Sequence, residues 1–509
     1  MVLEQQYRQQ ADELRHVLPA QVGIEQLVTG SPFHELTVFE SIKRQVRRVC
    51  LRIAEIAIGA PLYVENEYRE LAVLEPRARA LLTHLIRKGV ITSWRLGVAA
   101  PDQPYVTTCR LSLKTIELPS GTHVTMGGNT GGGSGPTPQD ALIPALAELL
   151  ERYSTAMWRE ESIVRGSYEN LRAEGAISPE TFSFFSPAQL KQELFAESRV
   201  SADRKLDWVH ARLLADARSV LIPAQLVYMF YGVDHPEQPV FWDTNSNGVA
   251  AGQTYEDAAY RAICEAIERD AFFMFWLNRL SPPRVRLESI PDPEVQRLLK
   301  ECARYRLTVH ILDCTTDVGV PTFVGVAIDP YGEVPVAVSA VTDLDVDQAL
   351  RKLVHELTKF SHAILYTTAD TLPKVPEEIV SMGQRQLYWC KSDWRAAIGF
   401  FIAGPEKTYA DLVAGGTHEP TALSPLERVA EILRKKKLPG YLIDVTNTDA
   451  REAGLRVVRA VMPDLIPIYF REARKYLGIT RLYTAPHTMG YESGARTAQD
   501  LNSTPHPFL

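Results

Sequence analysis

Two stretches of this chain repeat the same acidic residues and glycines at the same spacing. Adding 117 to each shared position in residues 131–152 gives the matching position in residues 248–269. The shared residues are Gly131, Gly135, Thr137, Asp140, Ala141, Ala145, Glu148, Glu151 and Arg152, matched by Gly248, Gly252, Thr254, Asp257, Ala258, Ala262, Glu265, Glu268 and Arg269. Each copy reads as a glycine-rich turn, a Thr-x-x-Asp helix start and an apolar helix that carries Glu-x-x-Glu-Arg. The repeat therefore predicts two equivalent helices.

The acid pairs indicate the chemistry of a metal site. Carboxylates at positions i and i+3 lie on one face of a helix. Two such pairs that face each other would repel unless cations neutralise them. Magnesium prefers hard oxygen ligands, and glycine backbone can come close to phosphate. The repeat thus fits a magnesium–triphosphate site.

Each acid also has a purely structural interpretation. Glu148 with Arg152, and Glu265 with Arg269, are i,i+4 ion pairs worth about 0.3–0.5 kcal/mol on an exposed helix. The surrounding residues are apolar, however, and buried acids need partners. Exposed ion pairs without a binding role would explain one copy, but not two copies with identical spacing. We therefore favour the functional interpretation.

Each copy also carries an aspartate three residues after a threonine. Asp140 and Asp257 follow Thr137 and Thr254 in this way, as in a capping box. We predict capping for Asp140. For Asp257, capping and metal contact both stay open.

Composition narrows the class of protein. The chain has 509 residues, of which 45% are hydrophobic and 23% charged, as in a globular protein with several packed layers. A net charge of -7 argues against a nucleic-acid or anionic-membrane protein. No apolar run approaches the ~20 residues that span a bilayer, and the N-terminus does not resemble a signal peptide. The six scattered cysteines indicate reduced thiols. We expect a cytoplasmic enzyme.

Helices and strands alternate irregularly along the chain, which predicts an α+β fold with pseudo-repeated helix and sheet units. We expect a helical region at residues 1–80, either a winged-helix-like peptide-binding module or a flank of the main domain, and that domain at residues 81–509. A third helix repeats part of the pattern, because Ala349 stands seven residues before Glu356. Lys359 replaces the second acid there. The last residues, GARTAQDLNSTPHPFL, predict an extended tail.

At this level of detail the chain resembles a known family. The segments GGGSGPTPQDALIPALAELLERYS and SNGVAAGQTYEDAAYRAICEAIERDAF resemble the two ATP-binding motifs of YcaO-domain proteins, and YLIDVTNTDAREAGLRVVRAVMPDL resembles a stretch near the end of that domain. The resemblance runs from about residue 80 to the C-terminus. It implies ATP and Mg2+ as cofactors and phosphorylation of a peptide amide oxygen. In the cyclodehydratase branch of the family, Cys, Ser or Thr side chains then form thiazolines or oxazolines.

The tail favours that branch over the alternative, peptide thioamidation. Cyclodehydratases of the family commonly end in a proline-rich PxPxP, often as PHPFP, which places the terminal carboxylate in the active site as a candidate base. This chain ends in Pro505-His506-Pro507-Phe508-Leu509. The resemblance therefore implies Leu509 and His506 as catalytic residues.

The resemblance also assigns the remaining site residues. The metal ligands it implies are Glu148, Glu151, Asp257, Glu265 and Glu268. The ATP-binding residues it implies are Ser134, Ser246, Asn247, Arg152 and Arg269. Three positions depart from the family pattern, since Ser134 replaces a Lys, Pro144 a Ser and Lys359 a Gln. These departures keep a second hypothesis open, in which the chain is a non-catalytic scaffold subunit.

The partners follow from the same resemblance. The substrate would be a ribosomal precursor peptide, recognised with the help of an E1-like or leader-peptide-binding protein. Azole products would need a flavin dehydrogenase in the same pathway. We expect a homodimer, with no nucleic acid or membrane partner.

Overall fold

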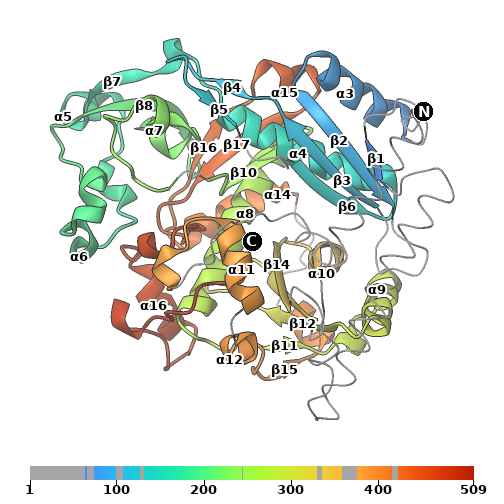
Figure 1. Ribbon diagram of the computed structural model, residues 1–509. Coiled ribbons are helices and arrows are strands. Elements are labelled where there is room, and N and C mark those ends of the chain that lie inside the picture. Colours follow the sequence, from blue (N-terminus) through green and yellow to red (C-terminus); the bar gives the residue numbers. More distant parts are fainter. Residues whose placement is uncertain are drawn as a thin grey trace, which may run out of the picture. The chain divides into compact units, whose positions relative to one another are not determined.

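The computed structural model describes residues 63–65, 74–98, 107–125, 131–243, 245–329, 335–357, 375–391, 393–414 and 422–508. Residues 62–509 form one compact unit. This unit holds three larger sheets, each with its own helices, and all their strand pairs are antiparallel except one parallel pair in the third sheet (Figure 1).

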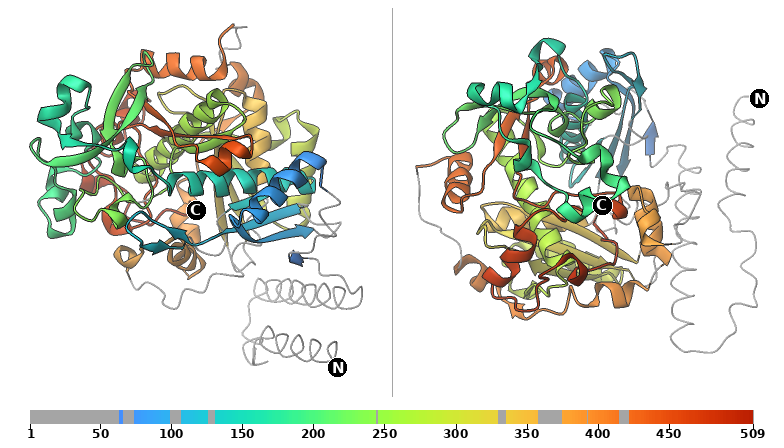
Figure 2. Two further views of the ribbon diagram at one scale, coloured as in Figure 1. Left: turned by 90° about the horizontal axis from the view of Figure 1, so that it is seen from above. Right: turned by 90° about the vertical axis from the view of Figure 1, so that its left-hand side faces the viewer.

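The first sheet carries the first copy of the motif at its edge. Its strands, in order, are β1 (Tyr63–Glu65), β2 (Ile91–Val98), β3 (Thr107–Leu113) and β6 (Gly131–Gly135). Helix α4 (Pro138–Thr155) packs on β3 and β6, and α3 (Pro76–Arg87) packs on β2 and α4. These elements, blue to teal, lie together in both views of Figure 2. The first acid pair therefore sits on a helix that covers one sheet.

The second sheet carries the second copy at its edge. Its strands, in order, are β10 (Val249–Gly252), β17 (Arg456–Val461), β16 (Tyr441–Asp444), β8 (Lys205–Leu213) and β7 (Val164–Ser167), with β9 (Ser219–Pro223) also paired to β8. Helix α8 (Tyr255–Leu277) packs on β10 and β17, and α14 (Pro425–Lys435) packs on α8. Fifteen of the 23 residues of α8 are buried, so this helix forms part of the core.

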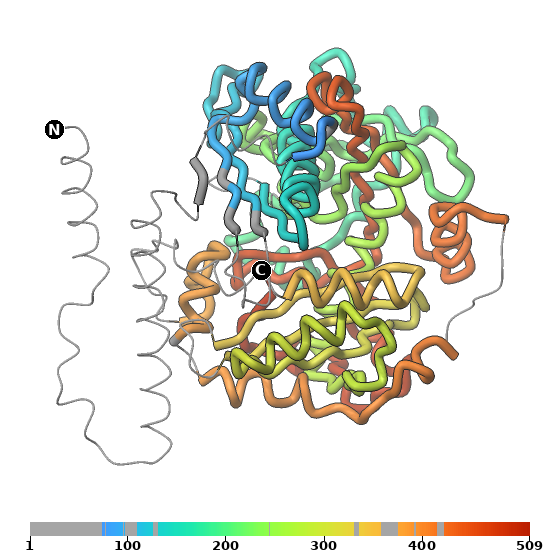
Figure 3. Tube along the Cα trace, turned by 90° about the vertical axis from the view of Figure 1, so that its right-hand side faces the viewer, coloured from blue at the N-terminus to red at the C-terminus, as the bar shows by residue number. Residues whose placement is uncertain are grey.

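The third sheet has the same plan. Its strands, in order, are β14 (Val336–Thr342), β13 (Thr322–Ile328), β12 (Thr308–Asp313), β11 (Arg284–Val285) and β15 (Glu406–Lys407). Helix α10 (Val346–Leu357) packs on β13 and β14, and α9 (Pro293–Arg304) packs on β12 and α10. Figure 3 shows these two helices, yellow and gold, running side by side. The third related helix that the spacing of Ala349 and Glu356 indicated is therefore confirmed as α10.

The three edge strands and their helices form a closed ring of contacts. Strand β6 leads into α4, β10 into α8 and β14 into α10. Each helix also contacts the edge strand of the next unit: α4 contacts β10, α8 contacts β14, and α10 contacts β6. The acidic faces of the three helices are thereby brought toward one region.

Glycines allow the first unit to pack closely. A Cβ added at Gly133 would lie 2.0 Å from the carbonyl oxygen of Ala141, so β6 lies directly on the α4 backbone. In the second unit, Gly248 has a φ of +70°, which side chains rarely adopt. The glycine-rich turns therefore set strand–helix contacts, whether or not a phosphate is bound.

Other predictions can be compared with the fold. The mixed helix and sheet architecture with repeated units is confirmed. Residues 1–62 lie outside the described residues, so the peptide-binding module and the boundary at residue 80 stay predictions. The cysteines within the described residues are free thiols, and four of the five are buried. No helix in the described part of the chain is long and apolar enough to cross a membrane.

Candidate functional site

The first acid of each motif copy is bonded to the strand before its own helix. The Gly132 amide donates to Glu148 Oε2 at 2.6 Å, and the Val249 amide donates to Glu265 Oε2 at 3.2 Å. The separation is sixteen residues in both copies. Because the bond repeats with the sequence motif, the two copies are equivalent in geometry as well as in residue type.

The second acid of each copy reaches the strand of the next unit. Glu151 Oε1 accepts a hydrogen bond of 2.7 Å from the amide of Ala251 in β10. Glu268 is hydrogen-bonded by the backbone of Thr342, the last residue of β14. These carboxylates therefore link consecutive units of the ring.

The third helix adds an acid that the sequence analysis did not assign to the site. Glu356 Oε2 accepts a 2.6 Å hydrogen bond from Ser339 Oγ of its own strand, β14. Its charge raises the pKa of Glu268, so the two carboxylates lie near each other. The spacing from Ala349 to Glu356 was the signal for this residue. Lys359 lies outside the described residues. We refer to Glu148, Glu151, Glu265, Glu268 and Glu356 as the acid cage.

Burial and mutual repulsion perturb the acid cage. Burial raises the pKa of Glu151 to about 8, and the charges of Glu265 and Glu148 add to this rise. Burial also raises the pKa of Glu268 to about 8, with further contributions from Glu356 and Glu265. The pKa of Glu265 is raised by burial in spite of nearby arginines. Since like charges disfavour ionisation, a cation in the cage would stabilise the ionised acids.

The two motif arginines are held differently. Arg152 Nη2 lies 2.7 Å from Glu148 Oε1, which is a close ion pair. Arg269 Nη2 lies 3.5 Å from Glu265 and 3.7 Å from Glu268. The Nε and Nη1 atoms of Arg269 are buried and have no hydrogen-bond partner within the described residues. A buried guanidinium with unused donors suits an anionic ligand.

A further arginine stands beside the acid cage. Arg459, in the middle of β17, is 1% exposed and donates through Nη1 to the carbonyl oxygen of Asn245 at 3.0 Å. Burial lowers its pKa to about 10, and the charge of Glu265 opposes this fall. The sequence analysis did not select Arg459. A charged residue in the apolar strand RVVRAV was the available signal, since buried charges need partners.

The other three predicted nucleotide-binding residues lie in strand β6 and in the segment that leads into β10. Asn247 is buried, and its Oδ1 accepts from the Ile468 amide at 3.3 Å. Ser246 precedes it, half-buried, in the turn that enters β10. In β6, the Ser134 hydroxyl is buried without a hydrogen-bond partner in the described part of the chain. The Ser134 hydroxyl is therefore available to a ligand. The side-chain oxygen of Asn247, by contrast, is already hydrogen-bonded to the backbone of Ile468.

The two aspartates each accept a hydrogen bond from a backbone amide at the start of their helix. Thr137 and Asp140 form a reciprocal capping box at the start of α4, which confirms the capping role of Asp140. Asp257 accepts from the Gln253 amide at 3.3 Å and from Arg261 Nε at 2.8 Å. It lies in the first turn of α8, eight residues before Glu265, about 12 Å along the helix axis at 1.5 Å per residue. These contacts favour capping for Asp257, and its metal contact stays an untested prediction.

The tail, predicted to be extended, contains one 3-10 turn at Ala498–Asp500, is free of helix and strand over residues 501–508, and ends beside the second motif copy. The Phe508 ring centroid lies 4.3 Å from the Arg269 guanidinium and 4.8 Å from the Phe272 ring. His506 is fully buried, and its Nε2 lies 2.9 Å from the Tyr469 carbonyl oxygen. Burial lowers the pKa of His506 well below its usual value. Leu509 lies outside the described residues.

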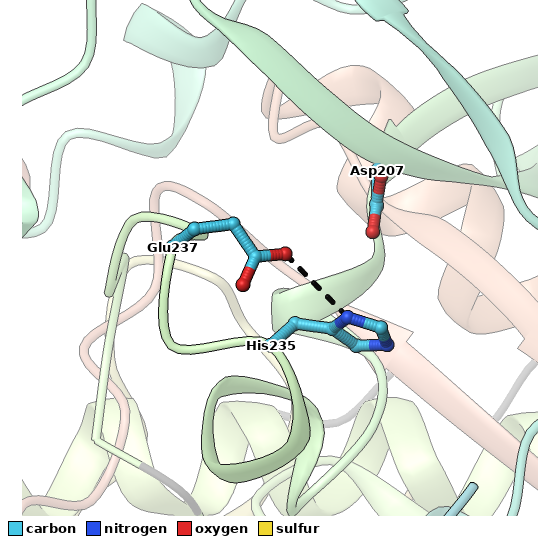
Figure 4. Close-up of side chains that lie close together, drawn as sticks. All are labelled: Asp207, His235 and Glu237. Carbon is cyan, nitrogen blue, oxygen red and sulfur yellow. Dashed lines mark ion pairs between the residues drawn. The ribbon is translucent and has the colours of Figure 1, made fainter. Parts of the chain in front are cut away.

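A separate group of acids surrounds His235 (Figure 4). His235 Nδ1 lies 3.5 Å from Glu237 Oε1, and Asp207 approaches from β8. Asp207 is the buried acid of this group, and both of its oxygens are engaged, one by Tyr231 Oη at 2.8 Å and one by Arg165 Nε at 3.4 Å. Because both oxygens of Asp207 already have partners, we regard this group as a structural network that ties β8 to the residues around His235.

The acid cage therefore fits a magnesium–nucleotide ligand better. It offers hard oxygen atoms, a raised pKa at three glutamates, and unused donors on Arg269. The side chains of Glu265 and Glu268 keep 24% and 13% of their exposed area, so a ligand can reach them. A cation and a phosphate group would satisfy both sets of charges.

Comparison with known proteins agrees with this fit. Residues 132–466 match the family model described as YcaO cyclodehydratase, ATP- and Mg2+-binding. An uncharacterized protein of Methanothermobacter thermautotrophicus is 25% identical over 336 residues, which cover 65% of this chain and 80% of that protein.

Solved structures share the fold. A heterocyclase in complex with substrate and cofactor superposes with a TM-score of 0.65 at 24% identity, covering 84% of this chain and 57% of that one. The heterocyclase TruD gives 0.57 at 25% identity, covering 74% and 52%. YcaO from Methanopyrus kandleri, bound with AMPPCP and Mg2+, gives 0.55 at 17% identity, covering 79% and 94%. This chain thus spans little more than half the length of the two heterocyclases.

Proposed function

The chain belongs to the YcaO cyclodehydratase family, which binds ATP and Mg2+, and from this premise we propose that it is an ATP-dependent cyclodehydratase. Its substrate would be a ribosomally made precursor peptide whose Cys, Ser or Thr residues become thiazolines or oxazolines. One observation carries the proposal: Arg269 contacts both the Phe508 ring of the tail and two glutamates of the acid cage.

The reaction is balanced with the peptide and ATP alone. The side-chain sulfur or oxygen attacks the preceding amide carbonyl carbon, and its proton passes to a base. The former amide oxygen takes the γ-phosphoryl group of ATP, which releases ADP. Loss of phosphate and of the amide proton then forms the C=N bond of the ring. The peptide loses one water per ring, and ATP becomes ADP and phosphate.

The chain's own residues divide this work. Glu148, Glu151, Glu265 and Glu268, joined by Glu356, would hold magnesium, which when bound neutralises phosphate charge and orients the γ-phosphoryl group. Arg269 would donate its unused N–H groups to phosphate, since a guanidinium binds phosphate oxygens bidentately. Arg152, Ser134, Ser246 and Asn247 would line the nucleotide.

The tail would supply the base. We assign this role to the terminal carboxylate of Leu509, because Phe508 lies against Arg269. His506 is buried, and its ring is enclosed by Phe273 and Tyr469 at centroid distances of 4.8 Å. An imidazole in this position is suited to anchoring the tail. We therefore propose an anchoring role for His506 in place of the catalytic role first assigned to it.

Calorimetry of Mg·AMPPCP binding tests the nucleotide site. We expect micromolar affinity for the purified chain and none for a Glu265→Gln/Glu268→Gln double variant. A matched Asp257→Asn variant should keep the affinity, since that side chain lies about three helix turns from the Glu268 carboxylate. Failure of the unmodified chain to bind, with or without partner proteins, would leave the scaffold hypothesis.

Product mass tests the reaction itself. The chain would be mixed with Mg·ATP, a candidate precursor peptide and its leader-binding partner, and the peptide weighed by mass spectrometry. A cyclodehydratase removes one water for each ring. Exchange of oxygen for sulfur in the presence of sulfide would instead identify thioamidation.

A further inference from the structure

The tail is held by a row of side chains that bind three consecutive carbonyl groups. Trp276 Nε1 donates to the Thr504 carbonyl oxygen at 3.2 Å, and Trp389 Nε1 donates to that of Pro505 at 3.1 Å. Arg385 Nη1 reaches the His506 carbonyl oxygen at 3.4 Å. Arg385 and Trp389 both belong to helix α11 (Met382–Lys391).

The carbonyl oxygens of this tail are the backbone groups best able to form hydrogen bonds with the rest of the protein. Pro505 and Pro507 have no backbone N–H, so these positions cannot donate hydrogen bonds. The tail forms neither helix nor strand over residues 501–508. Over residues 504–506 the tail backbone is therefore held through its carbonyl acceptors by side-chain donors of α8 and α11.

Arg385 is an unusual side chain to bury for stability alone. It is 0% exposed, and its Nη1 lies 2.6 Å from Glu472 Oε1. Its Nη2 also donates to the Phe470 carbonyl oxygen at 2.8 Å, and Lys475 Nζ lies 2.9 Å from the second Glu472 oxygen. A buried ion pair often stabilises a fold no more than apolar residues of similar volume. What it adds is directed hydrogen bonds to defined backbone atoms.

We propose that Arg385 and Trp389 are positioning residues that place the end of the tail in the active site. They fix the backbone at residues 505 and 506, three and two residues before Phe508, whose ring lies on Arg269. Arg269 in turn approaches Glu265 and Glu268. The role in catalysis rests on the proposed function, whereas the anchoring of the tail does not.

Hydrogen–deuterium exchange tests the anchoring without any substrate. In the full chain, Trp389→Phe removes one donor and keeps most of the ring. We therefore expect about fivefold faster exchange at the amides of Thr504, His506 and Phe508, the effect of one lost hydrogen bond. Trp394→Phe, in helix α12 (Trp394–Gly399), is the matched control because its indole packs with Arg395. Unchanged tail exchange in Trp389→Phe, or faster exchange throughout the chain, would overturn the proposal.

A kinetic cycle tests the positioning role. We expect Trp389→Phe to lower the kcat of phosphate release from Mg·ATP about fivefold and to leave the KM for ATP unchanged. In a Phe508→Ala background the same change should add almost nothing, because both act through the tail. Fully additive losses would contradict the proposal.

A third variant tests the anchoring role of Arg385 with little risk of misfolding. One further result distinguishes failure of the anchoring proposal from failure of the proposed function. Arg385→Lys keeps the charge opposite Glu472 but loses the planar fork, so it should speed tail exchange while the melting temperature stays close to that of the unmodified chain. Unchanged tail exchange in Arg385→Lys would contradict the anchoring role of Arg385. If the unmodified chain released no phosphate, the proposed function would fail, and the exchange experiment would still decide the anchoring.

Discussion

The two motif copies have the same acids at the same spacing but occupy different surroundings. In the first copy, Arg152 is paired with Glu148 at 2.7 Å, and the Glu148 side chain is 36% exposed. In the second copy, Arg269 stands 3.5 Å and 3.7 Å from two acids and keeps buried N–H groups without partners. The first arginine is largely satisfied by the protein, and the second is available to a ligand. The same motif can therefore stabilise the fold in one copy and bind a ligand in the other.

The strands differ in the same way. Gly133 in β6 corresponds to Ala250 in β10, so the first unit packs strand on helix without room for a Cβ, and the second accepts one. The second unit has in addition Arg459 and the end of the tail beside it. The strand and helix of the first copy are thus packed more closely. The second copy has the charged groups that would bind the ligand.

Substitution of Gly133 should have the largest effect on stability. In Gly133→Ala the new Cβ would lie 2.0 Å from the Ala141 oxygen, so the strand must shift, and we expect a loss of about 2–3 kcal/mol in the free energy of unfolding. Gly132→Ala is the control, because its Cβ would meet Glu148 Oε2 at 3.6 Å, an ordinary contact. Denaturant titration measures both. Equal stability of the two variants would contradict the close packing of β6 on α4 that we infer for the first unit.

The arginines should separate the copies in nucleotide binding. We expect Arg269→Met to weaken Mg·AMPPCP binding roughly 30-fold or more, as for the loss of a charge-assisted contact of about 2 kcal/mol. Arg152→Met should weaken it by less than about tenfold, since that guanidinium already has Glu148 as a partner. Calorimetry measures both affinities. A larger loss for Arg152→Met would reverse the comparison.

The shared property of the copies is the raised pKa of their second acids, and pH should reveal it. The pKa of Glu151 and of Glu268 rises to about 8 in the folded chain, so both bind protons more tightly there than in the unfolded chain. The stability that this provides is complete below about pH 4.5 and is lost as pH rises from there through about 8, by about 1.4 kcal/mol per pH unit for each group.

Denaturant titrations in EDTA between pH 6 and 9 measure this slope. The unmodified chain should lose stability as pH rises, and Glu151→Gln and Glu268→Gln should each lose it less steeply. A similar change of slope in both variants would mean that the two copies share one electrostatic environment. An unchanged slope in either would place its acid outside the cage.

The helix caps should show the smallest difference. Asp140→Ala breaks a reciprocal capping box, and we expect a loss of about 1 kcal/mol in unfolding free energy. Asp257→Ala also loses the pair with Arg261, and it should cost a similar amount while Mg·AMPPCP affinity stays unchanged. Thermal melts and calorimetry check the two expectations. Weaker nucleotide binding in Asp257→Ala would support the metal contact first considered for that residue.

Much of the local structure was predictable because its causes lie close together in the sequence. The Thr-x-x-Asp pattern predicted the caps of α4 and α8, and the structure has a threonine cap at each helix start. The i,i+3 spacing predicted that Glu148 and Glu151, and Glu265 and Glu268, share a helix face. The spacing of Ala349 and Glu356 also indicated the third helix, although not that Glu356 would lie near Glu268.

By itself, the sequence determined the repeat, the helix caps and the acidic character of the site, because helix periodicity and capping are local. The tertiary structure decided which acids meet. The bond from Glu151 to Ala251 spans 100 residues, and no local pattern encodes it. Tertiary packing also buried Arg459, enclosed His506 and brought Phe508 onto Arg269. These contacts depend on how three sheets close into a ring, which is set by packing between distant segments and not by the spacing within any one of them.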